Sequence, residues 1–480
     1  MKAQRLTIAL ALTMLVSCQS KAPVPDVDDS VTAFDIESET QAEYNRLDEL
    51  GEHDFEGRVF NILDANDHPE MHINLPGDEL NGDILNDGLY ERDLFIEESY
   101  NVDIQYTQIT NAKNGTETLR SAVLAGDDTY TICISTLLGG TLGTLAVDGV
   151  LMNLCDVEEL SLGESWWSRL MYDQLKYDGI MYYTTGDIAP SMYQMPACYY
   201  LNTNLVDQYG ITTDFVGLVR EGKWTLDEAI NAAKDLSSDL NSDGVMHASD
   251  DQFGFVHSQT AGLAIAICAG VETSSIEDGE IKVDFTNDYT LTVIEKLREL
   301  MTPDIKHEDQ NDVITKTFAE GRALSLYHHT ESAAVFLRDM KDPYLILPMP
   351  KGDESQEDYH SFVNAWCNAF VALPKTCDPE FAGIITEALG YYSYTNIRPT
   401  AYEMTYKDKI LREEESAEML DIIFDTLYFD FNCVYDFGGS KAILEKAIVG
   451  DTELVSSIAA VEERIDADIA AFEEEWLSAN

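Results

Sequence analysis

The pattern of apolar and polar positions predicts an α/β fold. Residues 58–63 (RVFNIL) form a short apolar run typical of a buried strand, and a helical pattern follows over about 87–100. Apolar and polar residues then alternate over 102–106, which predicts a second strand, and residues 131–135 predict a third. The order strand, helix, strand is the start of an α/β unit, and open α/β sheets bind ligands where such strands end.

Two later helices have explicit signals. Thr225-Leu226-Asp227-Glu228 has the arrangement of a capping box and predicts a helix that runs to about Leu236. The C-terminal segment places apolar side chains at steps of three and four, which predicts one long helix with a single apolar face. These side chains are Leu454, Ile458, Val461, Ile465, Ile469, Phe472 and Trp476. Because the opposite face is acidic, we expect the stripe to pack in the core rather than to bind a membrane.

The first residues have the order of an export signal. Lys2 and Arg5 precede a short apolar run over 6–16, and small Ser17 and Cys18 follow. This run is too short to span a bilayer, and no other stretch approaches the roughly twenty apolar residues of a membrane helix. We therefore expect the rest of the chain to lie in water.

The segment Leu15-Val16-Ser17-Cys18 resembles a bacterial lipobox. The resemblance implies cleavage before Cys18 and attachment of lipid to its sulfur. Residues 1–17 are then a lipoprotein signal peptide, and 18–54 are the lipidated cysteine followed by a flexible acidic linker. An ordinary signal peptide with a chance cysteine is the alternative.

The composition excludes one class of partner. The 480-residue chain has a formal net charge of −58, which becomes about −60 without the signal, since 28 basic residues then stand against 88 acidic ones. Binding to phosphates needs clustered Lys and Arg, so nucleic acid is excluded as a partner. With 45% hydrophobic residues, the chain can still bury the cores of two or three domains.

The cysteines do not predict a disulfide framework. Seven remain after Cys18, an odd number without recognisable spacing, and they stand singly in apolar surroundings. They are Cys133, Cys155, Cys198, Cys268, Cys367, Cys377 and Cys433. We expect small core residues, at least one of them unpaired in a monomer.

Several stretches resemble the extracellular solute-binding proteins, of family 1 type, that serve carbohydrate ABC importers. They follow one another in the family's order and extend over nearly all of the chain after Cys18. The stretches are YYLNTNLV at 199–206, QYG at 208–210, GKWTLDE at 222–228, DQFGF at 251–255, FAEGRALSL at 318–326 and LPMP at 347–350.

The resemblance implies a two-lobed, periplasmic-binding-protein-like α/β fold with a hinge and a ligand cleft between the lobes. We expect one lobe at about 55–183 with 352–425, and the other at about 188–350 with 426–480. The implied function is capture of a sugar or oligosaccharide for the permease of an ABC importer. The protein is then a lipid-anchored monomer on the outer face of a bacterial cell membrane, and it is not an enzyme.

A sugar site needs planar polar groups for hydroxyls and aromatic rings for the apolar ring faces. We expect such groups from strand ends and from the segments that cross the hinge. The expected ligand-binding residues are Asp64, Asn66, Thr136, Asp187, Tyr193, His328, His329 and Trp366. Tyr193 and Trp366 would stack on the sugar, although a lone aromatic is more often a core residue, and Asp64 and Asn66 can equally cap a turn. No Arg or Lys is assigned to the cleft, so acidic ligands are not expected.

Two adjacent pairs have alternative interpretations. His328 and His329 could bind a metal, but neighbours alternate in direction along a strand and no Cys or acidic partner stands at ligand spacing, so a metal is not expected there. Trp166 and Trp167 could form a sugar platform, but adjacent large aromatics more often pack inside the protein.

The strongest local motif is D-x-N-x-D-G-x5-D at 239–250. It predicts a structural calcium ion bound by side-chain oxygens of Asp239, Asn241, Asp243 and Asp250 and by the carbonyl of Val245. Aspartate at the twelfth position shortens the arm that a glutamate would supply, and His247 at the ninth leaves room for a water. A simple surface turn is the alternative.

Other functions stay open. A lipid-anchored glycoside hydrolase would use two carboxylates at a set separation. The same fold could bind a peptide, a polyamine or a metal, or serve as a sensory receptor subunit. The sequence contains no nucleophile elbow, H-E-x-x-H, P-loop or Rossmann motif.

Overall fold

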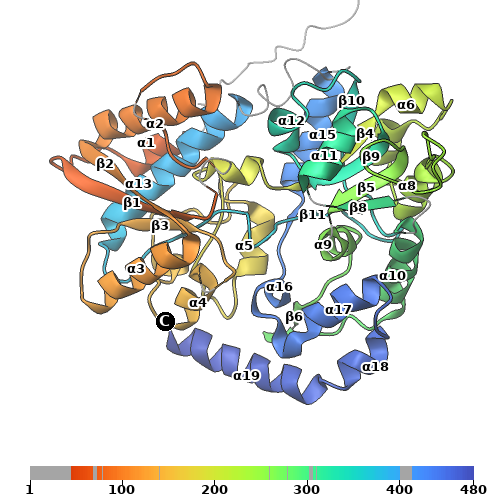
Figure 1. Cartoon of the computed structure of the whole chain (residues 1–480). Coiled ribbons are helices and arrows are strands. Elements are labelled where there is room, and N and C mark those ends of the chain that lie inside the picture. The colour runs from red at the N-terminus through yellow and green to blue at the C-terminus, as the bar shows by residue number, and fades with distance from the viewer. Residues whose placement is uncertain are drawn as a thin grey trace, which may run out of the picture. The chain divides into compact units, whose positions relative to one another are not determined.

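The computed structural model (Figure 1) describes most of the chain. Contacts divide the chain into two units, Met1–Asn45 and Arg46–Asn480. The predicted signal peptide, Cys18 and the linker up to residue 44 lie outside the described residues. Among the residues described, no helix has the length and apolar character to cross a bilayer. The described residues are 45–68, 73–77, 79–139, 141–258, 260–277, 279–301, 306–309, 311–400 and 413–480.

The first lobe is built on a four-stranded sheet in the order β12-β3-β1-β2. Strands β3, β1 and β2 are parallel, and β12 is antiparallel to β3. Parallel neighbours need a crossover, and helix α2 (Ile84–Tyr100) supplies it between β1 and β2, so the predicted strand-helix-strand unit is confirmed. The strands are β1 (Arg58–Asn66), β2 (Val102–Thr110), β3 (Ile132–Ser135) and β12 (Phe370–Ala372). The other helices here are α1 (Arg46–Leu50), α3 (Ala112–Leu124), α4 (Leu142–Val147), α5 (Arg169–Leu175) and α13 (Pro379–Tyr392).

Helix α1 shows that the folded unit begins before the predicted end of the linker at residue 54. Arg46 Nε donates a hydrogen bond of 3.0 Å to Glu387 Oε1, and Trp167 Nε1 donates one of 2.6 Å to Glu387 Oε2. Glu387 is fully buried, and a buried carboxylate needs such partners. Trp166 and Trp167 are themselves buried, which confirms packing rather than a sugar platform for this pair.

The second lobe is built on a five-stranded sheet in the order β10-β4-β9-β5-β8. Strands β9, β5 and β8 are parallel, whereas β4 is antiparallel to both β9 and β10. The strands are β4 (Ala197–Asn202), β5 (Phe253–Ser258), β8 (Lys306–Asp309), β9 (Ala323–His329) and β10 (Tyr344–Pro348). The helices are α6 (Thr203–Gln208), α7 (Phe215–Arg220), α8 (Leu226–Ala233), α9 (Ala261–Cys268), α10 (Asp288–Leu300), α11 (Asn311–Ala319) and α12 (Ser332–Val335). A small antiparallel ribbon joins β6 (Ser275–Glu277) to β7 (Glu280–Lys282).

Helix α8 begins where the capping-box motif predicts, but without the predicted cap. The Thr225 side chain makes no capping hydrogen bond, and the Leu226 N–H donates instead to the Lys351 carbonyl at 2.7 Å. Tertiary contact with the segment after β10 therefore satisfies the first N–H of the helix, while the expected hydrogen bond from the Glu228 N–H to the Thr225 hydroxyl is absent. The helix ends at Ala233 rather than near Leu236.

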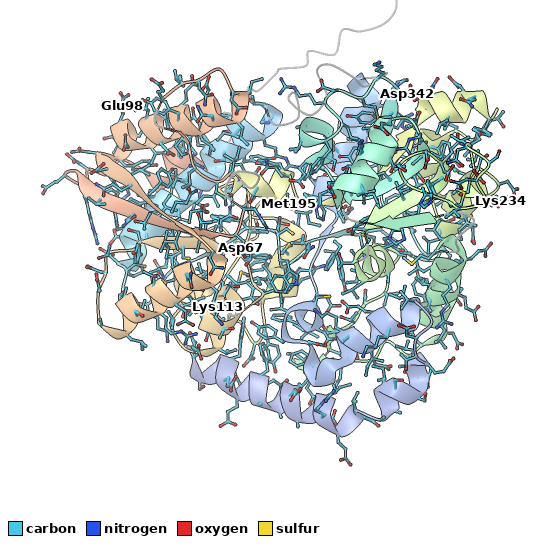
Figure 2. The ribbon with its side chains drawn as sticks, in the orientation of Figure 1. Asp67, Glu98, Lys113, Met195, Lys234 and Asp342 are labelled. Atoms are coloured by element: carbon cyan, nitrogen blue, oxygen red, sulfur yellow. The ribbon has the colours of Figure 1, made fainter. Side chains whose placement is uncertain are left out.

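The chain passes from the first sheet to the second through residues 185–196, which precede β4, and returns through 349–369, between β10 and β12. The first crossing contains a short 3₁₀ turn, Pro190–Tyr193, and the buried Met195, which Figure 2 labels between the two lobes. In the second crossing, β11 (Ser361–Phe362) pairs in parallel with β13 (Leu427–Tyr428). Figure 2 also labels Glu98 and Lys234, which are exposed on the outer flanks of the first and second lobe.

The C-terminal elements differ from the predicted lobe boundaries. Helix α15 (Glu413–Asp425) belongs to the predicted first-lobe segment but packs against β10 of the second sheet. The predicted single C-terminal helix is two helices, α18 (Leu454–Ala459) and α19 (Glu462–Ser478). The break lets α18 pack against α17 (Ser440–Ile448) while α19 returns to α4 of the first lobe, where Figure 1 marks the C-terminus.

Most of the predicted apolar stripe is buried, which confirms core packing for this segment. Leu454, Ile458, Ile465, Phe472 and Trp476 are buried. The stripe packs against the first lobe in its last part, beside Tyr182, rather than only against the elements that precede it in sequence. The seven cysteines are free thiols, and five of them are buried as expected of core residues, whereas Cys155 is exposed and Cys367 is half-buried.

Candidate functional site

A cavity of about 360 Å³ lies where strand ends of the second lobe face loops of the first. This volume is within the range of small-molecule pockets, at its lower end. The lining residues come from both lobes and from the α16 (Phe431–Tyr435) and α17 region. They are Leu138, Ser258, Thr260, Ala261, Leu263, Ala264, Tyr327, His328, His329, Phe362, Asn364, Ala365, Trp366, Cys367, Cys433, Lys441 and Glu445.

Parallel strands position the second-lobe wall. Strands β5 and β9 are parallel neighbours, so their carboxyl ends meet at the same edge of the sheet. Ser258 ends β5, while His328 and His329 end β9, and all three line the cavity. The location follows the rule that open α/β sheets bind ligands at the carboxyl ends of their strands.

Trp366 gives the first-lobe wall an exposed aromatic surface. Its side chain lines the cavity and is 57% exposed, whereas the other four tryptophans are buried. Gly139, in the loop after β3, lies under the ring with φ +78°, and a Cβ there would be 3.2 Å from Trp366 Cζ3. Both the backbone angle and the close approach therefore favour glycine. An exposed indole in a cavity is suited to stacking on an apolar ligand face.

His328 presents a neutral imidazole. Burial lowers the pKa of His328 from 6.5 to about 3, with a smaller lowering from His329. The Ser332 hydroxyl and His328 Nδ1 are hydrogen-bonded at 2.6 Å, which fixes the ring. At neutral pH this ring can exchange hydrogen bonds with a ligand without bringing a charge.

Glu331 corrects the expectation that no acidic partner stands near the histidine pair. Ligand atoms of His328, His329 and Glu331 all lie within 4.8 Å of one another. Glu331 is buried, and its Oε2 has no hydrogen-bond partner. Burial raises the pKa of the Glu331 carboxyl from 4.5 to about 7.

Lys441 corrects a second expectation, that the cleft contains no basic residue. Lys441 and Glu445 stand four residues apart on α17, and both line the cavity. A base and an acid on one wall allow a ligand with one charge of either sign as well as a neutral one.

Three of the predicted ligand residues near the first sheet lie inside the first lobe, away from the cavity lining. Asp64 Oδ1 and Oδ2 accept hydrogen bonds of 3.1 Å from Asn74 and Gln108, and burial raises the pKa of Asp64 to about 6. Asn66 Oδ1 accepts from the His68 N–H, as in a turn, and Thr136 is buried. Only His328, His329 and Trp366 of the eight predicted residues are brought together at the cavity.

Asp187 and Tyr193 form a buried pair in the first crossing segment. The Tyr193 hydroxyl donates to Asp187 Oδ1, and Asp187 Oδ2 has no hydrogen-bond partner. Burial raises the pKa of Asp187 from 3.8 to about 8, and the charge of Arg398 partly opposes this shift. Tyr193 packs edge-on against Phe424 and is buried, so the pair holds the crossing segment rather than presenting a stacking surface.

The raised pKa of Asp187 predicts a pH-dependent stability. A folded-state pKa above the unfolded value contributes stability that is fully present below pH 4 and is lost as the pH rises through about 8. Asp187→Asn cannot ionise, so we expect the variant to gain roughly 1 to 3 kcal/mol relative to the native protein between pH 5 and pH 8. Melting temperatures of both proteins at the two pH values measure this difference.

Asp127→Asn is the matched control, because it makes the same replacement of a carboxyl by an amide at an exposed position where the carboxyl pKa is lowered. Its melting temperature should follow that of the native protein from pH 5 to pH 8. Parallel pH profiles for Asp187→Asn and the native protein would contradict the role assigned to Asp187.

The calcium-like loop is closed by its own hydrogen bonds. Asp239 accepts from the N–H groups of Ser242 and Gly244, and Asn241 Nδ2 donates to Asp243 and Asp250. Asp239, Asp243 and Asp250 are not among the described residues whose ligand atoms gather within 4.8 Å. Calcium binding by this loop, with the carbonyl of Val245, stays a prediction.

A larger cavity of about 860 Å³ lies elsewhere, between Arg169, Arg398 and α15. An ion pair of 3.5 Å joins Arg398 to Asp425 in its wall. This cavity has no strand end in its lining, so the smaller cavity is the better candidate for the ligand.

Most of the residues that line the cavity were not predicted from the sequence. Asn364 stands two residues before Trp366 and accepts its backbone N–H at 3.0 Å, so proximity to Trp366 was an available signal. Ser258 ends β5 in the same way as His328 and His329 end β9, so its position at a strand end was also an available signal. Nothing in the sequence indicated that Lys441 and Glu445 line the cavity, because the packing of α17 depends on distant contacts.

No family model matches the chain, and no curated protein sequence matches it. Solved structures do match. The cyclic alpha-maltosyl-1,6-maltose binding protein from Arthrobacter globiformis is 11% identical over 86% of this chain and 99% of that chain, with a TM-score of 0.60. The galacto-N-biose-/lacto-N-biose I-binding protein of the ABC transporter from Bifidobacterium longum, in complex with lacto-N-biose, is 12% identical over 88% and 99%, with a TM-score of 0.57. A cyclo/maltodextrin-binding protein complexed with maltotetraose is 11% identical over 86% and 97%, with a TM-score of 0.55. These similarities confirm the predicted two-lobed α/β fold.

Proposed function

We propose that this protein captures a small carbohydrate in the cavity between its lobes and delivers it to an ABC importer. The observation that carries the proposal is Trp366, an exposed indole on the first-lobe wall of a cavity whose opposite wall holds His328 and His329. An aromatic face beside hydrogen-bonding groups is what a sugar ring requires.

The chemistry of the wall suits an uncharged, hydroxyl-rich ligand. Ser258, Thr260 and Asn364 offer hydroxyl and amide groups, and His328 is neutral at pH 7. Closure of the lobes would bring these groups onto the ligand from both sides. The proteins with a similar fold that contain lacto-N-biose and maltotetraose support a sugar over other solutes.

A hydrolase has less support from this cavity. Glycoside hydrolysis uses a pair of carboxylates across the scissile bond. Glu445 is the one carboxylate residue among the described residues that line the cavity. We therefore infer binding without turnover, and incubation of the purified protein with glycans should release no products.

Attachment to the membrane belongs to the same proposal. The lipobox-like segment before Cys18 supports lipid anchoring on the outer face of a bacterial cell membrane, next to the permease. Incorporation of a labelled fatty acid that is lost in Cys18→Ser would support the anchor, and equal labelling of both proteins would contradict it.

A thermal-shift screen of the purified protein tests the function. Sugars and oligosaccharides form one panel, and amino acids and peptides form another because Lys441 and Glu445 could bind their charged ends. A ligand at 100 times its Kd stabilises the native state by about 2.7 kcal/mol, so a binder should produce a saturable rise in melting temperature. A rise with one carbohydrate supports the proposal, whereas a rise confined to the second panel contradicts the sugar assignment.

The same screen with and without calcium tests the loop at 239–250. We propose a structural calcium ion there, held by Asp239, Asn241, Asp243, Asp250 and the carbonyl of Val245. Calcium should raise the melting temperature of the native protein but not of Asp239→Ala. Equal behaviour of the two proteins would leave the loop as a surface turn.

A further inference from the structure

Two histidines and a glutamate gather at the end of β9, beside the cavity. Ligand atoms of His328, His329 and Glu331 lie within 4.8 Å of one another, and no other group of three or more His, Cys, Asp or Glu does so in the part of the chain that the structure describes. The two imidazole ring centroids are 5.3 Å apart. A turn at 330–331 follows the strand and brings Glu331 beside both rings.

One oxygen of the buried Glu331 carboxyl group, Oε2, lacks a hydrogen-bond partner. Glu331 is only 6% exposed. Its backbone is fixed, because its N–H donates to the Gln194 carbonyl at 2.9 Å. A buried carboxylate oxygen without a donor is unfavourable, and a cation beside it would offset that cost.

We propose that His328, His329 and Glu331 bind a divalent transition-metal ion of the zinc class. Two imidazole nitrogens and one carboxylate oxygen form a ligand set that zinc accepts, with a fourth position left open. Calcium and magnesium prefer oxygen ligands throughout, so they fit these side chains poorly. His328 and His329 line the cavity, so the open position faces the place where the ligand is proposed to bind.

Ser332 supplies the outer contact that such a site needs. Metal-binding histidines commonly use their second ring nitrogen in a hydrogen bond, which fixes the tautomer and the ring orientation. The 2.6 Å hydrogen bond between Ser332 Oγ and His328 Nδ1 leaves Nε2 of His328 for the metal. Ser332 begins α12 directly after Glu331, so the same turn holds a metal-binding residue and its support.

The test uses the purified full-length protein, stripped of metal with a chelator and titrated with zinc chloride in a calorimeter. Excess calcium in the buffer occupies the exposed carboxylates of a chain with net charge −58. We expect one zinc site per chain, and loss of this stoichiometric site in His329→Ala and in Glu331→Gln, because each variant removes one of the three metal ligands. Ser332→Ala should weaken it about 10-fold through the orientation of His328.

His247→Ala is the matched control, because this imidazole is exposed and belongs to the loop at 239–250. It should bind zinc as the native protein does. The absence of a stoichiometric site, or equal affinities in the native protein and in both His329→Ala and Glu331→Gln, would overturn the proposal. Circular dichroism of each variant verifies its fold, and Ser332→Ala keeps the test decisive if Glu331→Gln does not fold. Since no sugar is present, failure here is distinct from failure of the proposed sugar binding.

Discussion

Replacing Trp366 with alanine is expected to weaken carbohydrate binding thirtyfold or more while leaving the melting temperature of the ligand-free protein nearly unchanged. Truncation of a tryptophan at the centre of a binding site costs roughly 2 to 4 kcal/mol, and each 1.4 kcal/mol is about tenfold in affinity. The indole of Trp366 is 57% exposed, so its removal takes little from the core. A loss of affinity without a loss of stability would show that Trp366 contacts the ligand, because removal of a core residue would also lower the melting temperature.

The affinity is measured by calorimetry with the carbohydrate that the thermal screen selects. Trp366→Phe keeps an aromatic face and should retain part of the affinity. Phe95→Ala is the matched control, since Phe95 is an aromatic on α2 with 42% exposure that does not line the cavity. Native affinity in Trp366→Ala would remove the main support for the sugar site.

The fold could be predicted because its signals are local. The apolar run at 58–63 and the alternation over 102–106 became β1 and β2, parallel neighbours joined by α2. Features that depend on distant contacts could not be predicted in this way. The Thr225 side chain makes no capping hydrogen bond, and the first N–H of the helix, that of Leu226, donates to the Lys351 carbonyl, more than a hundred residues away in sequence.

A residue of the site could be predicted from its position at a strand end only where that strand end lies at the cavity between the lobes. His328 and His329 end β9 and line the cavity, whereas Asp64 and Asn66 end β1 and are hydrogen-bonded within the first lobe. The sequence does not say which strand ends meet a second lobe. Glu331 is different, because H-H-T-E at 328–331 places an acid two residues from His329 and was available as a signal.

For the C-terminal apolar stripe, the sequence likewise predicts that the face is buried but not which lobe it packs against. Its spacing predicts a buried face, and Trp476 is fully buried. The partner of that face is the segment just before the first crossing, where Tyr182 and Tyr183 pack on the indole at centroid distances of 4.6 and 6.1 Å. The Tyr182 hydroxyl also donates to the Trp476 carbonyl at 2.7 Å. Helix α19 therefore ties the end of the chain to the base of the hinge.

This packing predicts a large loss of stability in Trp476→Ala. The indole contacts Tyr182, Tyr183, Phe431 and Phe472, and the cavity left by its removal cannot be filled by these ring systems without repacking. Replacement of a buried tryptophan by alanine costs roughly 3 to 5 kcal/mol. Chemical denaturation followed by fluorescence and circular dichroism measures the change in the free energy of unfolding.

Leu477→Ala is the matched control, because Leu477 is the next residue on the same helix and is 44% exposed. A surface substitution of this kind changes stability by only about 0.5 kcal/mol or less. If the two lobes unfold in separate transitions, the loss in Trp476→Ala should fall on the transition that includes Tyr182, because the indole packs against the first lobe. Equal stabilities of the two variants would mean that α19 is not needed to hold the base of the hinge, and that the buried stripe contributes little to the fold.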